Sequence, residues 1–220
     1  MGVSAARKAT AVLISGRGSN MQALLDAAKD PAYPARIVRV ISNVWDAGGL
    51  KGAEAAGVAT SVIDHRAYKG RPAFEAALDQ ALRADGIEIV CLAGFMRLLT
   101  ADFVDAWRDQ LINIHPSLLP AFPGLDTHAR ALAAGVRFTG CTVHFVRPTM
   151  DEGPIIVQAA VPVLPGDDEP TLAARVLAAE HKAYPLALKL VAGGKAKVVR
   201  ERVETAEERF PQEPVFSPGP

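Results

Sequence analysis

The sequence predicts a single α/β domain with a mostly parallel, twisted sheet, helices on both faces and an antiparallel hairpin in its C-terminal part. Short apolar runs rich in β-branched residues alternate with segments whose apolar residues recur at helical spacing. That alternation favours parallel strands joined by right-handed crossovers. The 220 residues, half of them hydrophobic and 22% charged, are enough for one domain with a substantial core.

Strands and helices alternate regularly through the first half of the chain. Gly57 ends one expected helix, and Pro72 suits the first turn of the next. The strands are expected at residues 11–15, 37–41, 58–63 and 87–92, and the helices begin at Met21, span residues 50–56 and begin at Pro72.

A buried strand at residues 111–114 opens the second half. Pro116 stops it, because proline lacks the amide hydrogen that a central strand donates. Residues 139–146 and 155–163 predict the antiparallel hairpin, and an acidic pair before Pro170 marks the start of the longest helix. The helices are expected at residues 101–107, 129–134 and 171–192, with one more short strand at residues 198–199.

Residues 9–199 are expected to form the domain, with residues 1–8 as a disordered leader and residues 200–220 as a flexible, acidic, proline-rich tail. Lysine and arginine number 24, as do aspartate and glutamate, so the chain offers no global field for nucleic acid. The apolar run that follows the leader, residues 11–14, is far too short for a signal peptide or a membrane span. We therefore expect neither nucleic acid nor a membrane as partner.

The two cysteines, Cys91 and Cys141, lie far apart in separate apolar runs. They form neither a metal-binding spacing nor a disulfide framework, and we expect both to be buried, inert thiols. A reducing, cytoplasmic location and a chain without metal fit this pattern.

Asn113 and His115 interrupt the apolar strand just before Pro116. They are two residues apart, so both point to the same face of an extended chain, at the carboxyl end where ligands bind in open α/β sheets. The same pair would also serve simply to hold the turn that follows. His144 lies inside another expected strand, and a lone histidine there is usually structural.

The first expected strand runs into a glycine-containing loop, Gly16-Arg17-Gly18-Ser19-Asn20, and then into a helix. Backbone amides and a helix N-terminus in this arrangement hold an anion such as one phosphate, and Ser19 and Asn20 add donors that can also cap the helix. The loop lacks the third glycine of a dinucleotide fingerprint and the Gly-Lys-Ser/Thr of a P-loop. The alternative is a tight turn before a capped helix.

Residues 93–99 follow the strand at 87–92 and so lie at the same edge of the sheet. Met96, Leu98 and Leu99 could line an apolar slot there, and Arg97 could face an acidic partner. A hydrophobic first turn of a helix explains the same composition equally well.

Asn113, His115 and Asp151 together suit the transfer of an acyl group to an amine. Such a transfer passes through a tetrahedral intermediate, and its oxyanion needs preorganised hydrogen-bond donors. The amide of Asn113 can donate to that oxygen whatever the protonation state of the site. His115 can donate as imidazolium and move a proton, and a carboxylate nearby would favour that charge. No nucleophilic serine or cysteine with a base is evident, so direct transfer fits better than a covalent intermediate.

A resemblance to a known family is carried by five segments: SGRGSN, AGFMRLL, NIHPSLLP, FPGLDTH and MDEGPI. In order and spacing they resemble the phosphoribosylglycinamide formyltransferases, folate-dependent transferases of purine synthesis with a Rossmann-like single domain. NIHPSLLP with a downstream Asp-x-Gly-Pro is specific for the wider formyltransferase superfamily, and SGRGSN points to the phosphoribosyl branch. The match covers most of residues 12–185.

The resemblance implies that 10-formyltetrahydrofolate, a co-substrate, donates its formyl group to the amine of glycinamide ribonucleotide. Asn113, His115 and Asp151 match the family's catalytic residues. Glu180, which composition alone would leave on a solvent-facing helix surface, matches the acid that contacts the substrate ribose. The other implied positions are Gly18, Ser19 and Asn20 for the phosphate, and Arg71, Met96, Arg97, Leu98, Leu99 and Asn113 for folate. Asp126 departs from the family pattern, in which histidine is frequent at this position. The chain is expected to act as a monomer or homodimer.

Two other functions remain open from the sequence. A formyltetrahydrofolate deformylase would send the formyl group to water, but that family normally carries an extra N-terminal regulatory domain. A non-catalytic nucleotide-binding module would use SGRGSN without the three polar residues. A methionyl-tRNA formyltransferase and a dinucleotide oxidoreductase are disfavoured by the short acidic tail and by the incomplete glycine pattern.

Overall fold

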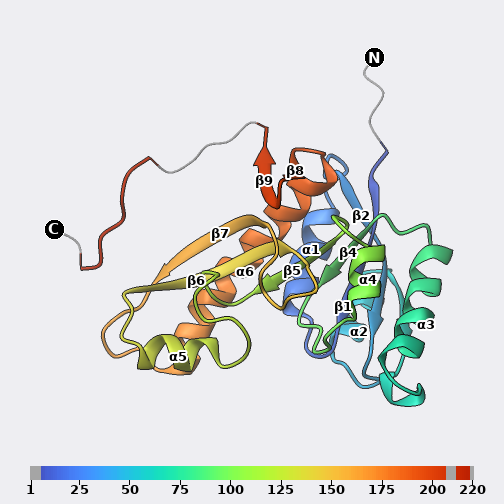
Figure 1. Ribbon diagram of the computed structural model, residues 1–220, viewed down its shortest axis with the longest axis horizontal. Coiled ribbons are helices and arrows are strands. Elements are labelled where there is room, and N and C mark those ends of the chain that lie inside the picture. The colour runs from blue at the N-terminus through green and yellow to red at the C-terminus, as the bar shows by residue number, and fades with distance from the viewer. Residues whose placement is uncertain (1–5, 207–211, 219–220) are drawn as a thin grey trace.

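The computed structural model describes residues 6–206 and 212–218. Its centre is a seven-stranded sheet in the order β3-β2-β1-β4-β5-β6-β7, and a separate hairpin pairs β8 with β9 (Figure 1). The strands are Lys8–Ile14 (β1), Ala35–Ser42 (β2), Ala59–Val62 (β3), Ile89–Leu92 (β4), Leu111–His115 (β5), Phe138–Phe145 (β6), Ile155–Pro162 (β7), Ala196–Val199 (β8) and Arg202–Thr205 (β9).

Strands β1 to β5 are parallel to their neighbours, whereas β6 is antiparallel to β5 and β7 is antiparallel to β6. The expected fold class, a mostly parallel sheet ending in an antiparallel hairpin, is confirmed. The chain order reverses at β1, which lies between β2 and β4. A crevice for ligands is expected at the carboxyl ends of the strands beside such a reversal.

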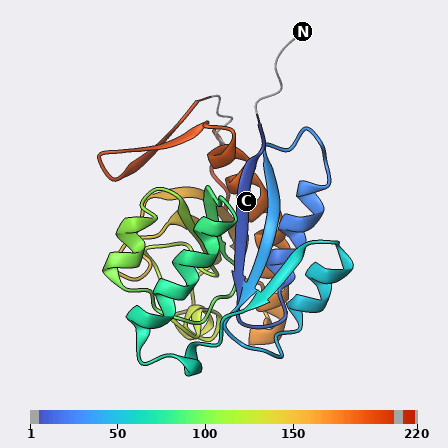
Figure 2. The same cartoon turned by 90° about the vertical axis from the view of Figure 1, so that its right-hand side faces the viewer.

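Helices cover both faces of the sheet. Figure 2 shows α3 and α4 on one side and α1 and α2 on the other. One apolar core joins α1, α2 and α6 to the sheet, and a second joins α3 and α4 to the opposite face of β1, β2 and β4. The helices are Ser19–Ala28 (α1), Gly49–Ala55 (α2), Arg71–Ala84 (α3), Ala101–Ala106 (α4), Thr127–Ala133 (α5) and Glu169–Ala192 (α6), with a short 3-10 helix at His65–Ala67 (η1).

Both expected domain edges contain more structure than the sequence indicated. Lys8, expected in the leader, starts β1, because its amide bonds Pro34 O at 2.7 Å and its ammonium pairs with Glu88. Strand β9 lies in the expected tail. It forms through a two-residue turn at Arg200 and Glu201, whose φ values of 50° and 57° suit a tight hairpin although neither residue is the usual Asn or Gly.

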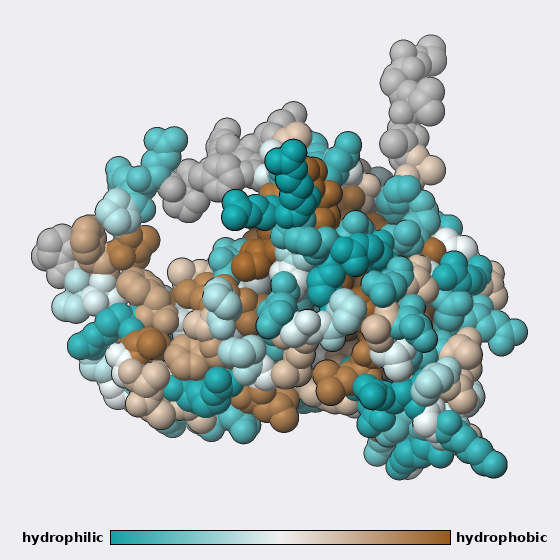
Figure 3. All heavy atoms as spheres, viewed as in Figure 1, coloured by the Kyte–Doolittle hydropathy of each residue, from teal (hydrophilic) through white to brown (hydrophobic). Residues whose placement is uncertain are grey.

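The face of the molecule shown in Figure 3 is a mosaic of hydrophilic residues and separate hydrophobic patches. Among the described residues, no helix is long and apolar enough to cross a bilayer. The same residues contain no cluster of three or more His, Cys, Asp or Glu placed to hold a metal ion. Cys91 and Cys141 are buried free thiols, as expected, and burial raises the pKa of each to about 12.

Candidate active site

Asn113, His115 and Asp151 meet at the carboxyl end of β5. His115 Nδ1 lies 3.5 Å from Asp151 Oδ2, and the two side chains are only 8% and 9% exposed. Asp151 reaches β5 because it follows β6, the strand that pairs with β5, in the turn before β7. Its φ of 59° is a left-handed conformation that is uncommon for residues other than glycine. The three residues that the sequence singled out for acyl transfer therefore form one cluster.

His144 belongs to the same cluster, although the sequence analysis assigned it a structural role. It stands opposite Asn113 in the β5–β6 pairing, and its Nε2 lies 3.3 Å from Asn113 Nδ2 and 4.0 Å from Asp151 Oδ1. The only signal that could have found it is strand register, which a single sequence does not give. These contacts place it against the side chain of Asn113, the candidate oxyanion donor.

The partners of His144 define which hydrogens its ring carries. Burial lowers the pKa of His144, so the neutral ring is favoured. Nδ1 lies 2.9 Å from Phe145 O and donates to it, which leaves Nε2 as the acceptor for the Asn113 amide. One amide hydrogen of Asn113 is thus fixed on His144, and the second remains available for an acceptor in the site.

His115 is bounded by acceptors at both ring nitrogens. Nδ1 faces the Asp151 carboxylate, and Nε2 lies 3.0 Å from the carbonyl oxygen of Phe122. A hydrogen on Nε2 can be donated to the Phe122 carbonyl, and a second hydrogen on Nδ1 would face the Asp151 carboxylate. Asp151 also accepts from Gly124 N at 2.8 Å, so the segment around residues 122–124 covers the His115 and Asp151 side chains.

A set of buried polar contacts holds this covering segment. Ser117 Oγ donates to Ala121 O at 2.6 Å, and Thr142 Oγ1 donates to Ser117 O at 2.7 Å. A contact on the exposed surface adds to these: Arg130 donates to Pro123 O at 2.5 Å, with its guanidinium over the Phe122 ring. Phe122 itself has a φ of 53°, so its carbonyl is aimed at His115 by a left-handed backbone.

The glycine loop places a free helix N-terminus near a buried carboxylate. Gly18, with a φ of 73°, is the N-cap of α1, and a Cβ there would lie 2.9 Å from Gly49 Cα. Among the described residues no side chain caps the helix, a role that the sequence had left open to Ser19 and Asn20. Asn20 Nδ2 instead donates to Glu180 Oε2 at 2.7 Å. The first amides of α1 are therefore available to an anion.

Glu180 is buried rather than solvent-facing. Burial raises the pKa of its carboxyl, and the Asn20 hydrogen bond lowers it in part. A hollow of about 470 Å³ beside the glycine loop is lined by Ser19, Gln22, Ala23, Asp26 and His181. The resemblance-based positions for phosphate and ribose thus lie on facing elements, α1 and α6.

The positions expected to contact folate are spread along one edge of the sheet. Residues 93–99 form no helical turn, and Met96 and Leu98 are 68% and 63% exposed. Arg97 Nε is buried without a hydrogen-bond partner in the described part of the chain. Arg71 is exposed at the start of α3, and no described residue forms a hydrogen bond or ion pair with it.

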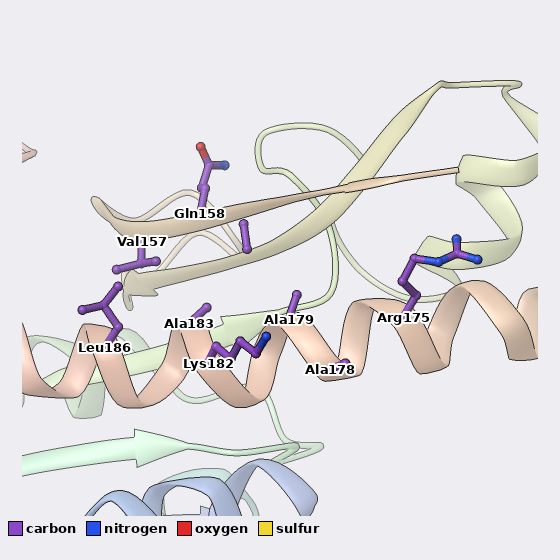
Figure 4. A pocket seen from close by; sticks show the side chains of 9 residues that line it. Val157, Gln158, Arg175, Ala178, Ala179, Lys182, Ala183 and Leu186 are labelled. Carbon is purple, nitrogen blue, oxygen red and sulfur yellow. The ribbon is translucent and has the colours of Figure 1, made fainter. Parts of the chain in front are cut away.

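A second hollow, of about 400 Å³, lies between β7 and α6 (Figure 4). Small alanines of α6 form part of its lining, with Lys182 and Arg175 among the longer side chains. None of the expected site residues lines it. It is separate from the cluster around His115.

Comparison with known proteins identifies the family. A family model described as formyl transferase matches residues 8–188, most of the chain. This chain belongs to the formyl transferase family. The phosphoribosylglycinamide formyltransferase of Escherichia coli is 43% identical over 91% of this chain and 94% of its own length.

Two further relatives span different proportions of their own chains. The structure of glycinamide ribonucleotide transformylase 1 from Symbiobacterium toebii superposes with a TM-score of 0.89 and 49% identity, over 91% of this chain and 95% of that one. The bovine trifunctional purine biosynthetic protein adenosine-3 is 54% identical over 86% of this chain. This chain spans only 19% of that protein, so the likeness concerns one part of a longer polypeptide.

Proposed function

We propose that this chain transfers the formyl group of 10-formyltetrahydrofolate to the amine of glycinamide ribonucleotide. The products are formylglycinamide ribonucleotide and tetrahydrofolate, in purine biosynthesis. The observation that carries the proposal is the Asn113–His144 and His115–Asp151 pairing at the carboxyl end of β5. The names of full-length relatives from Escherichia coli and Symbiobacterium toebii support the choice of substrates.

The proposed reaction is direct. The substrate amine attacks the formyl carbon, a carbon–nitrogen bond forms, and the carbonyl oxygen becomes an oxyanion. The free amide hydrogen of Asn113 and the imidazolium of His115 donate to that oxygen. The attacking nitrogen loses a proton, the leaving N10 of tetrahydrofolate gains one, and the carbon–N10 bond breaks, with His115 moving the proton.

The covering segment around residues 122–124 must move before the formyl oxygen can reach His115. In the structure the Nε2 hydrogen of His115 is held by the Phe122 carbonyl. The formyl oxygen must take that place, so residues near 122 have to withdraw as the substrate enters. Asp151 stays against Nδ1 during the exchange, and a carboxylate beside an imidazole favours the charged ring that the reaction uses.

The two substrates are assigned to two different groups of residues. Gly18, Ser19 and Asn20 receive the phosphate at the uncapped start of α1, and Glu180 contacts the ribose hydroxyls. The exposed side chains of Met96 and Leu98, beside the half-buried Leu99, receive the folate ring, with Arg97 and Arg71 toward its charged groups.

The cellular setting is part of the same proposal. We place the chain in the cytoplasm, as a monomer or homodimer, with two small-molecule substrates and neither nucleic acid nor a membrane as partner. The balanced charge and the buried free cysteines support this placement.

The test follows tetrahydrofolate release from 10-formyltetrahydrofolate, with and without glycinamide ribonucleotide. Release that requires the ribonucleotide is the expected result. Release without it would identify a deformylase, an alternative that a structural neighbour of that name, only 24% identical, supports at the level of fold alone. No release under either condition would contradict the transferase and favour a binding module.

A further inference from the structure

A chain of polar side chains crosses the carboxyl ends of β1 and β2 and reaches η1. Ser15 Oγ donates to Asn43 Oδ1 at 2.6 Å. Asn43 Nδ2 lies 3.1 Å from His65 Nδ1, and that same ring nitrogen lies 3.1 Å from Asn43 O. None of these contacts belongs to the cluster around His115.

The near end of this chain holds the loop at residues 93–99. Ser15 N donates to Gly94 O at 3.1 Å, and Met96 N donates to Ser15 Oγ at 2.8 Å. Phe95, between these two anchors, stacks on Phe74 with ring centroids 6.5 Å apart. The loop therefore has a fixed base beneath the exposed Met96 side chain.

The direction of the hydrogen bonds makes Asn43 the deciding group. Ser15 has a single hydroxyl hydrogen, and because Asn43 takes it, an oxygen lone pair is left facing Met96 N. Asn43 is only 2% exposed, so its side chain is held in place by the surrounding structure and presents a fixed acceptor to Ser15. His65 fixes Asn43 in turn, and its ring also meets Phe74 edge-on at 6.3 Å.

We propose that Asn43 is a positioning residue for the folate-side loop. It sets the Ser15 hydroxyl, and through it the backbone at Met96, so that the apolar side chains of residues 96–99 are presented in one arrangement. The inference rests on the proposed function for the assignment of folate to this loop. Ser15 also directly precedes the glycine loop, so it is next to the residues proposed for both substrates.

The experiment compares Asn43→Leu, which removes the acceptor, with Asn43→Asp, which keeps an oxygen toward Ser15. We expect the Michaelis constant for 10-formyltetrahydrofolate to rise about tenfold in Asn43→Leu, equivalent to about 1.4 kcal/mol. Both kcat and the Michaelis constant for the ribonucleotide should stay within about twofold of native, an energy difference of under 0.5 kcal/mol. Asn43→Asp should restore most of the folate affinity.

Thr10→Val is the matched control for loss of a buried hydrogen bond in the same sheet. Thr10 is fully buried at the other end of β1, with its hydroxyl 3.2 Å from Lys8 O. It should leave both Michaelis constants unchanged. If Asn43→Leu does not fold, Ser15→Ala removes the acceptor for Met96 N directly and should raise the folate constant in the same way.

Hydrogen exchange at the Met96 amide provides a readout that needs no substrate. Exchange should be faster in Asn43→Leu than in the native chain or Thr10→Val. Equal rises in both Michaelis constants, or an unchanged Met96 exchange rate, would overturn the inference. If the native chain transferred no formyl group, the proposed function would fail, while the exchange result would still report on the Asn43–Ser15 contact.

Discussion

Asn113 and His144 face each other across the β5–β6 pair, with Asn113 Nδ2 3.3 Å from a ring nitrogen that can only accept. This contact fixes the orientation of the amide, so its nitrogen and not its oxygen faces the site. An oxyanion donor is effective because it is already in place when charge develops. His144 thus acts through Asn113 and needs no contact with substrate.

Replacement of His144 by Leu should therefore lower kcat by about one to two orders of magnitude, less than loss of the donor itself, with small changes in both Michaelis constants. His144→Gln, which keeps an acceptor, should recover part of the rate. Thr139→Val is the control, because Thr139 is buried in the same strand and its hydroxyl has no partner among the described residues. Steady-state kinetics measure kcat in each variant. An equal loss of kcat in His144→Leu and Thr139→Val would show a packing effect only.

His115→Ala and Asp151→Asn should each lower turnover by about 10²- to 10⁴-fold, the usual range for a positioned acid or base. Substrate binding should change little, because these groups act on charge that develops during the reaction. The measurement is kcat beside the dissociation constant of each substrate, determined by calorimetry. Near-native turnover in both variants would remove His115 from the mechanism.

The order of strands and helices could be predicted from the sequence because each apolar run carries its own period. Asn113 and His115 could be paired for the same reason, since their spacing places them on one face of a strand. The two ends of the domain could not be predicted in this way. Strand β9 depends on a left-handed turn at Arg200 and Glu201, and neither residue type indicates that conformation.

The rest of the site depends on contacts between residues that are distant in the chain. His144 joins Asn113 through strand register, and Glu180 meets Asn20 across 160 residues. Neither relationship follows from local spacing, and Glu180 entered the expected site through family resemblance alone. The Phe122 carbonyl on His115 is a backbone contact with no side-chain signature in the sequence.

Glu180→Gln should make stability less dependent on pH. Burial raises the pKa of Glu180 in the folded chain, so native stability includes a favourable contribution below the unfolded pKa, near 4.3, that is lost as pH rises through the folded pKa. Gln stays neutral and still accepts from Asn20. The variant should therefore gain stability relative to native as the pH rises above about 4.3.

Urea unfolding at several pH values measures that gain, and Glu54→Gln, on the exposed surface of α2, controls for the loss of one negative charge. The same substitution should raise the Michaelis constant for the ribonucleotide, because a charged acceptor for ribose hydroxyls is lost. A stability difference that did not vary with pH would contradict the effect of burial on Glu180.

Arg147 ties the β8–β9 hairpin to the body of the fold. Its side chain is 8% exposed, and it donates to Asp109 Oδ1 at 2.7 Å and to Glu201 Oε2 at 2.6 Å. Arg147→Met should lower the free energy of unfolding by about 1–3 kcal/mol, because charge-assisted hydrogen bonds from a largely buried group are lost and the hairpin turn is released. Urea unfolding and limited proteolysis near residues 199–202 measure both effects.

Arg108→Met is the matched control, because Arg108 bonds the same Glu201 at 2.6 Å but is 47% exposed. Exposed ion pairs contribute about 0–1 kcal/mol, so this variant should unfold close to the native midpoint and keep the hairpin protected. Turnover should be unchanged in both, since neither arginine contacts the cluster at the end of β5. Equal destabilisation by the two substitutions would mean that burial of Arg147 adds nothing to the Glu201 contact, and that the hairpin is held by the packing of Val198 and Val203 against the core.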